Sequence, residues 1–180
     1  ATPDLLDTLV EAVKKQSHPV AHIAVGAIVR LNTPEAFDAI REIVKEGKVR
    51  GYTVKRHLVS ALGAHGDPAD IPLILPLLKS KDNGWLLSTP DALAHLGARE
   101  AVPQMIAMLN EVEKDRNRFR ELVGALVRLP TEEAYAALIN EYQRRDDKAW
   151  KLDVMRALLY NGMRSEAIEE VFIPEVASDD

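Results

Sequence analysis

The chain has 180 residues, of which 47% are hydrophobic and 5% aromatic, and 28 acidic residues outnumber 23 Lys and Arg. This composition excludes a disordered chain, and the formal charge of -5 disfavours nucleic acid and anionic membranes as partners. The lack of cysteine excludes disulfides and thiolate sites, and no apolar run approaches the roughly 20 residues of a membrane span.

In chain order, a recurring amphipathic helix is predicted to start at Thr2, Thr33, Asp67, Ala98 and Thr131. Apolar residues follow each start at helical spacing, which predicts one buried stripe per helix. Thr or Asp at most starts predicts an N-cap, and a following proline suits the first helical position. The three apolar columns are Leu6, Phe37, Ile71, Val102 and Tyr135; Leu9, Ile40, Ile74, Met105 and Leu138; and Val13, Val44, Leu78, Leu109 and Tyr142.

A second kind of apolar helix alternates with the first and carries an alanine at a fixed depth. A small residue at one site lets neighbouring helices approach closely. With these helices the pattern predicts eleven helices, one unpaired at the start and then five pairs, so the chain begins inside a repeat. The acid-rich segment 165–177 matches the repeat poorly and is predicted to cap the other end. The alanines are Ala27, Ala61, Ala92, Ala125 and Ala157.

The stretch ALGAHGDPADIPLILPLLK, from Ala61 to Lys79, combines A-L-G, D-P-A and a proline within an aliphatic run. It resembles the short HEAT-like repeat named for phycobilisome lyases, and ALAHLGAREAVPQMIAML repeats the pattern. The resemblance implies an all-α fold, a right-handed α-α superhelix (solenoid) of about five helical-hairpin repeats plus one leading helix. We expect a single solenoid domain over residues 1–176 and an acidic tail over 177–180. Pro72 and Pro103, typical of this family, should bend their helices.

Few residues suggest a catalytic or metal-binding site. The sequence has no His-Glu pair, which related HEAT-like hydroxylases use to hold iron, so we expect no metal, no cofactor and no catalytic residue. Trp85 and Trp150 occupy matching depths of their repeats, alongside Val20 and Val54, which predicts core positions. The five histidines, which we expect to be structural or solvated, are His18, His22, His57, His65 and His95.

Basic clusters recur at the junctions between repeats and should align along one edge of the stack. We interpret them as a solvated edge, and the alternative is a site for an acidic or phosphate-bearing partner. The clusters are Lys48, Arg50, Lys55 and Arg56; Lys114, Arg116, Arg118 and Arg120; and Arg144, Arg145, Lys148 and Lys151.

The exposed row of the Thr- or Asp-started helices lines the concave surface of HEAT-like solenoids. Its middle is apolar, which predicts a binding groove with an apolar floor and a polar rim. The alternative is that the prolines only set the curvature. The predicted floor is Pro72, Leu73, Pro76, Pro103 and Ala107, and the rim is Glu42, Lys45, Lys79, Asn110 and Asn140.

These observations predict a non-catalytic scaffold or adaptor that binds another protein in its concave groove. One alternative is a lyase-like accessory enzyme or chaperone that acts on a cofactor-bearing partner, and a second is nucleic-acid binding along the basic edge. We expect a soluble monomer with no membrane partner and no nucleic acid. The expected location is the cytoplasm, with an exported, periplasmic protein as the alternative.

Overall fold

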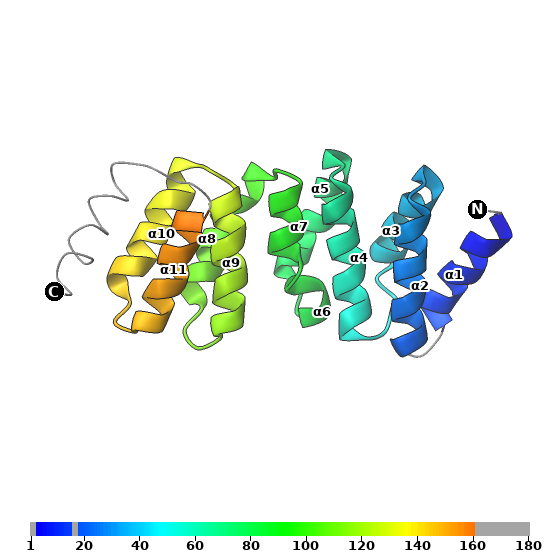
Figure 1. Cartoon of the computed structure of the whole chain (residues 1–180), viewed down its shortest axis with the longest axis horizontal. Coiled ribbons are helices and arrows are strands. Elements are labelled where there is room, and N and C mark those ends of the chain that lie inside the picture. Colours follow the sequence, from blue (N-terminus) through cyan, green and yellow to red (C-terminus); the bar gives the residue numbers. More distant parts are fainter. Residues whose placement is uncertain (1–2, 16–17, 161–180) are drawn as a thin grey trace. The chain divides into compact units, whose positions relative to one another are not determined.

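A computed structural model describes residues 3–15 and 18–160 of the chain (Figure 1). The predicted capping segment and the acidic tail at 177–180 lie outside these residues. Within the described ranges every regular element is a helix and no strand occurs, which confirms the all-α solenoid class. The chain forms two compact units, Ala1–Ala98 and Arg99–Asp180.

The first unit builds two layers of helices (Figure 1). In one layer α2 packs against α4 and α4 against α7, and in the other α1 packs against α3 and α3 against α5. The leading helix α1 also packs closely against α2. The elements are α1 (Pro3–Lys15), α2 (His18–Leu31), α3 (Pro34–Glu46), α4 (Tyr52–His65), η1 (Pro68–Asp70), α5 (Ile71–Ile74), η2 (Leu75–Lys79), α6 (Asn83–Leu86) and α7 (Thr89–His95).

The second unit repeats the two-layer arrangement. Helix α9 packs against α11 in one layer and α8 against α10 in the other, and α9 also packs against α8 and α10. The partner helix that the sequence pattern predicts after α11 falls outside the described residues. The elements are η3 (Arg99–Ala101), α8 (Val102–Glu111), α9 (Arg116–Arg128), α10 (Glu132–Arg144) and α11 (Lys148–Tyr160).

Side-chain caps start the helices where the sequence predicts them. The Thr33 hydroxyl accepts a hydrogen bond from the backbone N–H of Ala36 at 3.3 Å. Thr131 accepts one from Ala134 in the same way, at 3.1 Å. Each bond satisfies one of the backbone donors that a helix leaves unpaired at its N-terminus.

The predicted apolar columns form the core of each unit. The two later columns are buried from the second helix onward, and Val13 of α1 is 1% exposed. The first column is less regular, because Ile71 and Tyr135 are half-buried. Among the recurring alanines of the second kind of helix, Ala61 of α4, Ala92 of α7 and Ala125 of α9 are buried.

The proline-rich helix after Asp67 differs from the single bent helix that the sequence predicts. It is divided into η1, the four-residue α5, and η2, and Pro72 and Pro76 each stand near the start of a segment. A proline has no N–H to continue the helical ladder, so each one starts a new segment. Pro103 lies in the first turn of α8, where it removes no needed bond. Pro90 stands near the start of α7, as Pro72 and Pro76 do in their segments, and α6 ends before it.

Candidate partner-binding surface

In the first unit the predicted apolar floor lies on the divided helix. Pro72 and Pro76 are exposed and Leu73 is half-buried, whereas Ile74 and Leu78 are buried. The segment therefore buries one face and presents the prolines on the other. We call Pro72, Leu73 and Pro76 the proline surface.

The rim residues of the first unit occupy the same exposed columns. On α3, Glu42 and Lys45 stand in the columns of Pro76 and Lys79, and all of these residues are exposed. The Glu42 carboxylate and the Lys45 ammonium form an ion pair at 3.4 Å, with 63% and 69% of their side chains exposed. Because α3 packs against α5, charged and apolar columns lie on neighbouring elements of one layer.

In the second unit the predicted residues lie on α8 and α10. Pro103, Ala107 and Asn110 are exposed and share one face of α8, because they are four and then three residues apart. Asn140 is exposed on α10, which packs against α8. We call these four residues the α8–α10 surface. Met105 and Leu109 bury the opposite side of α8.

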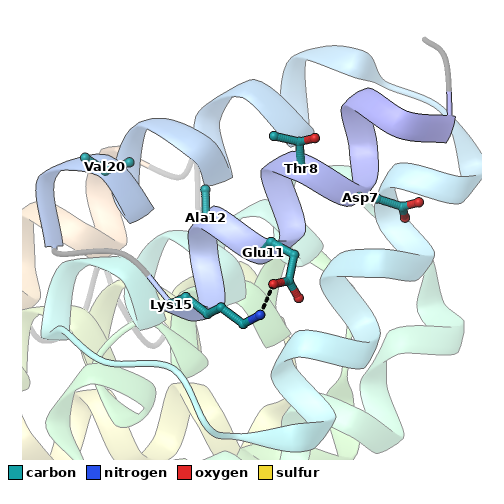
Figure 2. Close-up of a pocket in the computed structure, with 6 residues that line it drawn as sticks. All are labelled: Asp7, Thr8, Glu11, Ala12, Lys15 and Val20. Carbon is teal, nitrogen blue, oxygen red and sulfur yellow. Dashed lines mark ion pairs between the residues drawn. The ribbon is translucent and has the colours of Figure 1, made fainter.

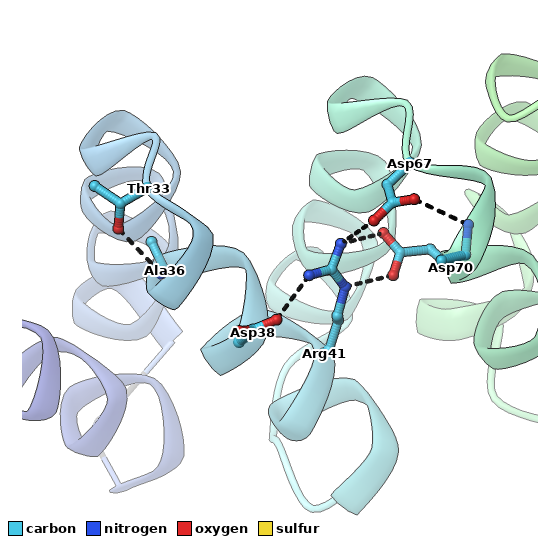
Figure 3. Close-up of polar contacts among 7 residues, drawn as sticks. Thr33, Ala36, Asp38, Arg41, Asp67 and Asp70 are labelled. Carbon is cyan, nitrogen blue, oxygen red and sulfur yellow. Dashed lines mark hydrogen bonds and ion pairs between the residues drawn. The ribbon is translucent and has the colours of Figure 1, made fainter.

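An ion cluster that the sequence analysis missed ties α3 to the start of the divided helix (Figure 3). The Arg41 guanidinium donates to Asp70 from Nε at 2.6 Å and to Asp67 from Nη2 at 2.9 Å. It also donates to Asp38 at 2.8 Å, within its own helix. Asp70 is only 2% exposed, and its hydrogen bond is the main reason why the pKa of Arg41 is raised. Only the spacing of Asp38 and Arg41 could have indicated part of this cluster.

The Arg41 cluster has two consequences for the surface beside it. It fixes α3 against residues 67–70, because one planar guanidinium bonds carboxylates from both segments. It also contains three carboxylates and only one cation, so its net charge is negative. One of these carboxylates, Asp38, has a side chain that is 70% exposed and stands in the column of Pro72. The α3 side of the proline surface is therefore polar and acidic.

The two-layer packing, the capped starts and the repeated columns agree with the comparison to known families. A family model described as HEAT repeats matches residues 6–89. Residues 6–89 are therefore similar to HEAT repeats. The matched range covers the proline surface and the Arg41 cluster. No curated protein matches the chain closely enough to count as a relative.

HEAT repeats commonly serve as protein-interaction scaffolds, and their fold is typically non-catalytic. Along residues 3–15 and 18–160, no helix combines the length and apolar character of a membrane span. The similarity to HEAT repeats makes an exposed surface the first candidate for a functional site.

Several residues of the basic clusters form ion pairs within their own unit. Lys55 donates to Asp82 at 2.5 Å and lowers the pKa of that carboxyl, mainly through this hydrogen bond. Arg116 donates to the buried Asp153 at 2.6 Å. Arg145 bonds Glu141, which is 0% exposed, at 3.0 Å. These three cations already pair with acidic groups of the protein itself, which argues against the alternative of an acidic or phosphate-bearing partner at these residues.

The aromatic and histidine residues have structural surroundings. Trp85 and Trp150 are 7% and 9% exposed, which confirms their predicted core positions. Val20 stands in the same column but is 46% exposed, so its predicted core position is wrong. The rings of His22 and His57 lie 4.8 Å apart, and within the described ranges no three His, Asp or Glu residues gather as a metal site would require. The His18 side chain lies outside the described residues.

Proposed function

We propose that the chain is a non-catalytic scaffold that binds another protein through the exposed columns of α3, the divided helix, α8 and α10. The observation that carries the proposal is the exposure of Pro72 and Pro76 directly beside the buried Ile74 and Leu78. This segment has its core contacts already, so its second apolar face is available to a partner.

Proline side chains suit a binding floor for a physical reason. A proline ring has no rotamer freedom to lose when a partner covers it, whereas a long side chain loses about 0.5–1.5 kcal/mol. The proline surface therefore offers apolar area that is held in place before binding. A helix or an extended segment of the partner would gain free energy by covering it.

The charged columns supply orientation. Glu42 and Lys45 are exposed at the edge, and charges in such positions mainly change the association rate and its salt dependence. Asp38 adds an acidic group beside the floor. We expect the partner to place a basic residue near Asp38 and an apolar residue over Pro72.

The test uses two alanines that are both exposed on helices. Ala107 lies on the α8–α10 surface, and Ala64 lies on α4, in the layer of the first unit that does not contain the divided helix. The full chain is fixed to resin, a partner is captured from the native host and identified, and its affinity for purified variants is measured by calorimetry. Ala107→Glu should weaken binding by at least about tenfold, and Ala64→Glu should leave it unchanged.

A variant of the proline surface tests the first unit. Leu73→Glu adds a charge to the floor, and it too should weaken binding at least about tenfold. Because Leu73 is half-buried, the Leu73→Glu variant must first show the same thermal midpoint as the parent protein, and only then are the two affinities compared. Parent affinity in both Ala107→Glu and a folded Leu73→Glu would contradict the proposal.

A further inference from the structure

We propose that the second unit binds a small phosphate monoester that carries an aromatic ring, in a hollow between α9 and α11. We call it the α9–α11 hollow. Its volume is about 380 Å³, within the roughly 300–1,000 Å³ that is typical of small-molecule sites. Helices α9 and α11 pack against each other in the layer of this unit that does not contain the α8–α10 surface. The ligand would therefore bind apart from the surface that the scaffold proposal assigns to a protein.

Positive charge is concentrated in the layer that holds this hollow. Helices α8 and α10 together carry four Glu and one Arg, whereas α9 and α11 carry seven Lys and Arg residues and two carboxylates. The whole chain has a formal charge of -5, so this basic layer is a local property of the second unit. A basic layer of this kind raises the local concentration of small anions.

Two guanidinium groups line the hollow, one from each helix. Arg120 belongs to α9 and Arg156 to α11, and both residues are exposed. The one carboxylate in the described lining, that of Asp153, accepts a hydrogen bond from Nε of Arg116 at 2.6 Å. Nε of Arg120 lies 3.6 Å from the same carboxylate, beyond hydrogen-bond distance. Because Arg116 neutralises Asp153, the planar forks of Arg120 and Arg156 can bind phosphate oxygens.

An aromatic ring and two small residues complete the hollow. Tyr160 is 86% exposed, so a ligand ring can stack on its face. Gly124 has no side chain, and a β-carbon added there would meet nothing within 4 Å, so the space beside it is open. Ala157 of α11 lines the hollow with only a methyl group. One helical turn separates Arg156 from Tyr160, so one ligand can contact the guanidinium and the ring at the same time.

A hollow of the first unit, beside α1, lacks these features (Figure 2). Its volume is about 500 Å³, and Figure 2 shows Asp7, Glu11 and Lys15 among the side chains around it. Lys15 forms an ion pair with Glu11, so the charge of Asp7 leaves this lining negative. None of its described lining residues is aromatic. A phosphate would be repelled there, so charge and the tyrosine ring, rather than size, distinguish the α9–α11 hollow.

The first test is calorimetric titration of the full chain with adenosine monophosphate, adenosine and ribose 5-phosphate. Adenosine lacks the phosphate and ribose 5-phosphate lacks the ring, so adenosine monophosphate should bind at least about tenfold more tightly than either. Its affinity should fall as the salt concentration rises, because both arginines are exposed. The proposal is overturned if adenosine monophosphate does not bind at about 1 mM, or if either comparator binds as tightly.

A peptide that contains phosphotyrosine presents the same chemistry on a protein side chain and is the second probe. Tighter binding of adenosine monophosphate would assign the hollow to a nucleotide, and tighter binding of the peptide would assign it to a phosphorylated protein. Both assignments require the phosphate. Equal binding of the peptide with and without its phosphate would therefore overturn the proposal.

Matched substitutions locate the site. Arg120→Gln and Arg156→Gln each remove a guanidinium from the lining and should raise the dissociation constant of adenosine monophosphate at least about tenfold. Lys148→Gln removes the same charge from an exposed position of α11 outside the lining and should change it less than about twofold. Tyr160→Ala should weaken the binding of adenosine monophosphate but not that of ribose 5-phosphate. Thermal melts verify that each variant is folded. Equal losses in Arg156→Gln and Lys148→Gln would show only a general attraction to the basic layer and would overturn the site.

Discussion

Gly63 of α4 lies so close to Ala92 of α7 that a β-carbon added at Gly63 would stand 2.6 Å from the Cα of Ala92. The two helices belong to one layer and pack side by side. Such a contact is possible only because one residue has no side chain and the other has a methyl group. The recurring alanine column of the sequence thus corresponds to a real close approach between helices.

We predict that Gly63→Ala destabilises the protein even though alanine favours helices. The nearest atoms belong to the backbone of α7, so the helix must move, and overpacking of this kind costs about 1–3 kcal/mol. Gly124→Ala on α9 is the matched control, since a β-carbon there would meet nothing within 4 Å. It should stabilise by about 0.4–1 kcal/mol. Urea unfolding measures both, and a stable Gly63→Ala would contradict the close contact.

We also predict that Ala125→Leu and Ala61→Leu each lower the free energy of unfolding by about 1–3 kcal/mol. Ala125 is 0% exposed and Ala61 is 6% exposed, so neither site has room for three more carbon atoms. Ala64→Leu, at an exposed site on α4, should stay within about 0.5 kcal/mol of the parent. Unchanged thermal midpoints in both buried variants would refute close packing at these sites.

The sequence could predict the features that depend on local spacing. The caps at Thr33 and Thr131 and the buried columns follow from residues a few positions apart, and the structure confirms them. The Arg41–Asp70 bond could not be predicted, because these residues are 29 positions apart and only the packing of α3 against the next repeat joins them. Likewise Val20 and Val54 share a column, and only the stacking of helices decides which one is covered.

The sequence could predict that the floor residues are exposed, and their role in binding stays a prediction. The columns of Pro72, Pro76 and Ala107 are exposed as the helical spacing requires. The division of the helix into η1, α5 and η2 was missed, because the pattern of apolar residues is the same for a bent helix and for three short segments. Proline geometry decides between them, since each ring removes a donor at a fixed point.

The Arg41 cluster should contribute strongly to the stability of the first unit. Arg41→Ala leaves the carboxylate of Asp70, which is 2% exposed, without its cation, and the expected loss is roughly 2–4 kcal/mol. Asp38→Ala removes only an exposed member of the cluster and should stay within about 0.5 kcal/mol. Chemical unfolding of both variants tests this difference, and equal small losses would show that Asp70 does not depend on Arg41.

Stability should fall in mildly acidic solution because of His57. Its pKa lies below 6.5 in the folded protein, first because it is partly buried and second because His22 is near. The unfolded chain therefore binds the proton more tightly, so the stabilising contribution is complete above about pH 6.5 and is lost as the pH falls toward the folded pKa. Thermal melts across this range should show the decline, and His57→Gln should reduce it. A parent whose melt does not change with pH would contradict the prediction.

A second loss of stability should follow at lower pH. Lys55 lowers the pKa of Asp82 below 3.8, so this contribution is present above about that pH and is lost as protonation proceeds below it. Lys55→Met should reduce the loss of stability in this lower pH range. It should not alter the loss of stability that His57 causes at higher pH. Identical acid melts of Lys55→Met and the parent would refute the assignment to this ion pair.

Hydrogen exchange of the full chain, with and without its captured partner, tests the scaffold claim most directly. Amides that a partner covers exchange more slowly, and peptides locate them along the sequence. The proposal predicts slower exchange in residues 68–79 and 102–111 and no change in residues 52–65 and 116–128, which belong to the other layer of their respective units. Protection confined to residues 52–65 and 116–128 would contradict it.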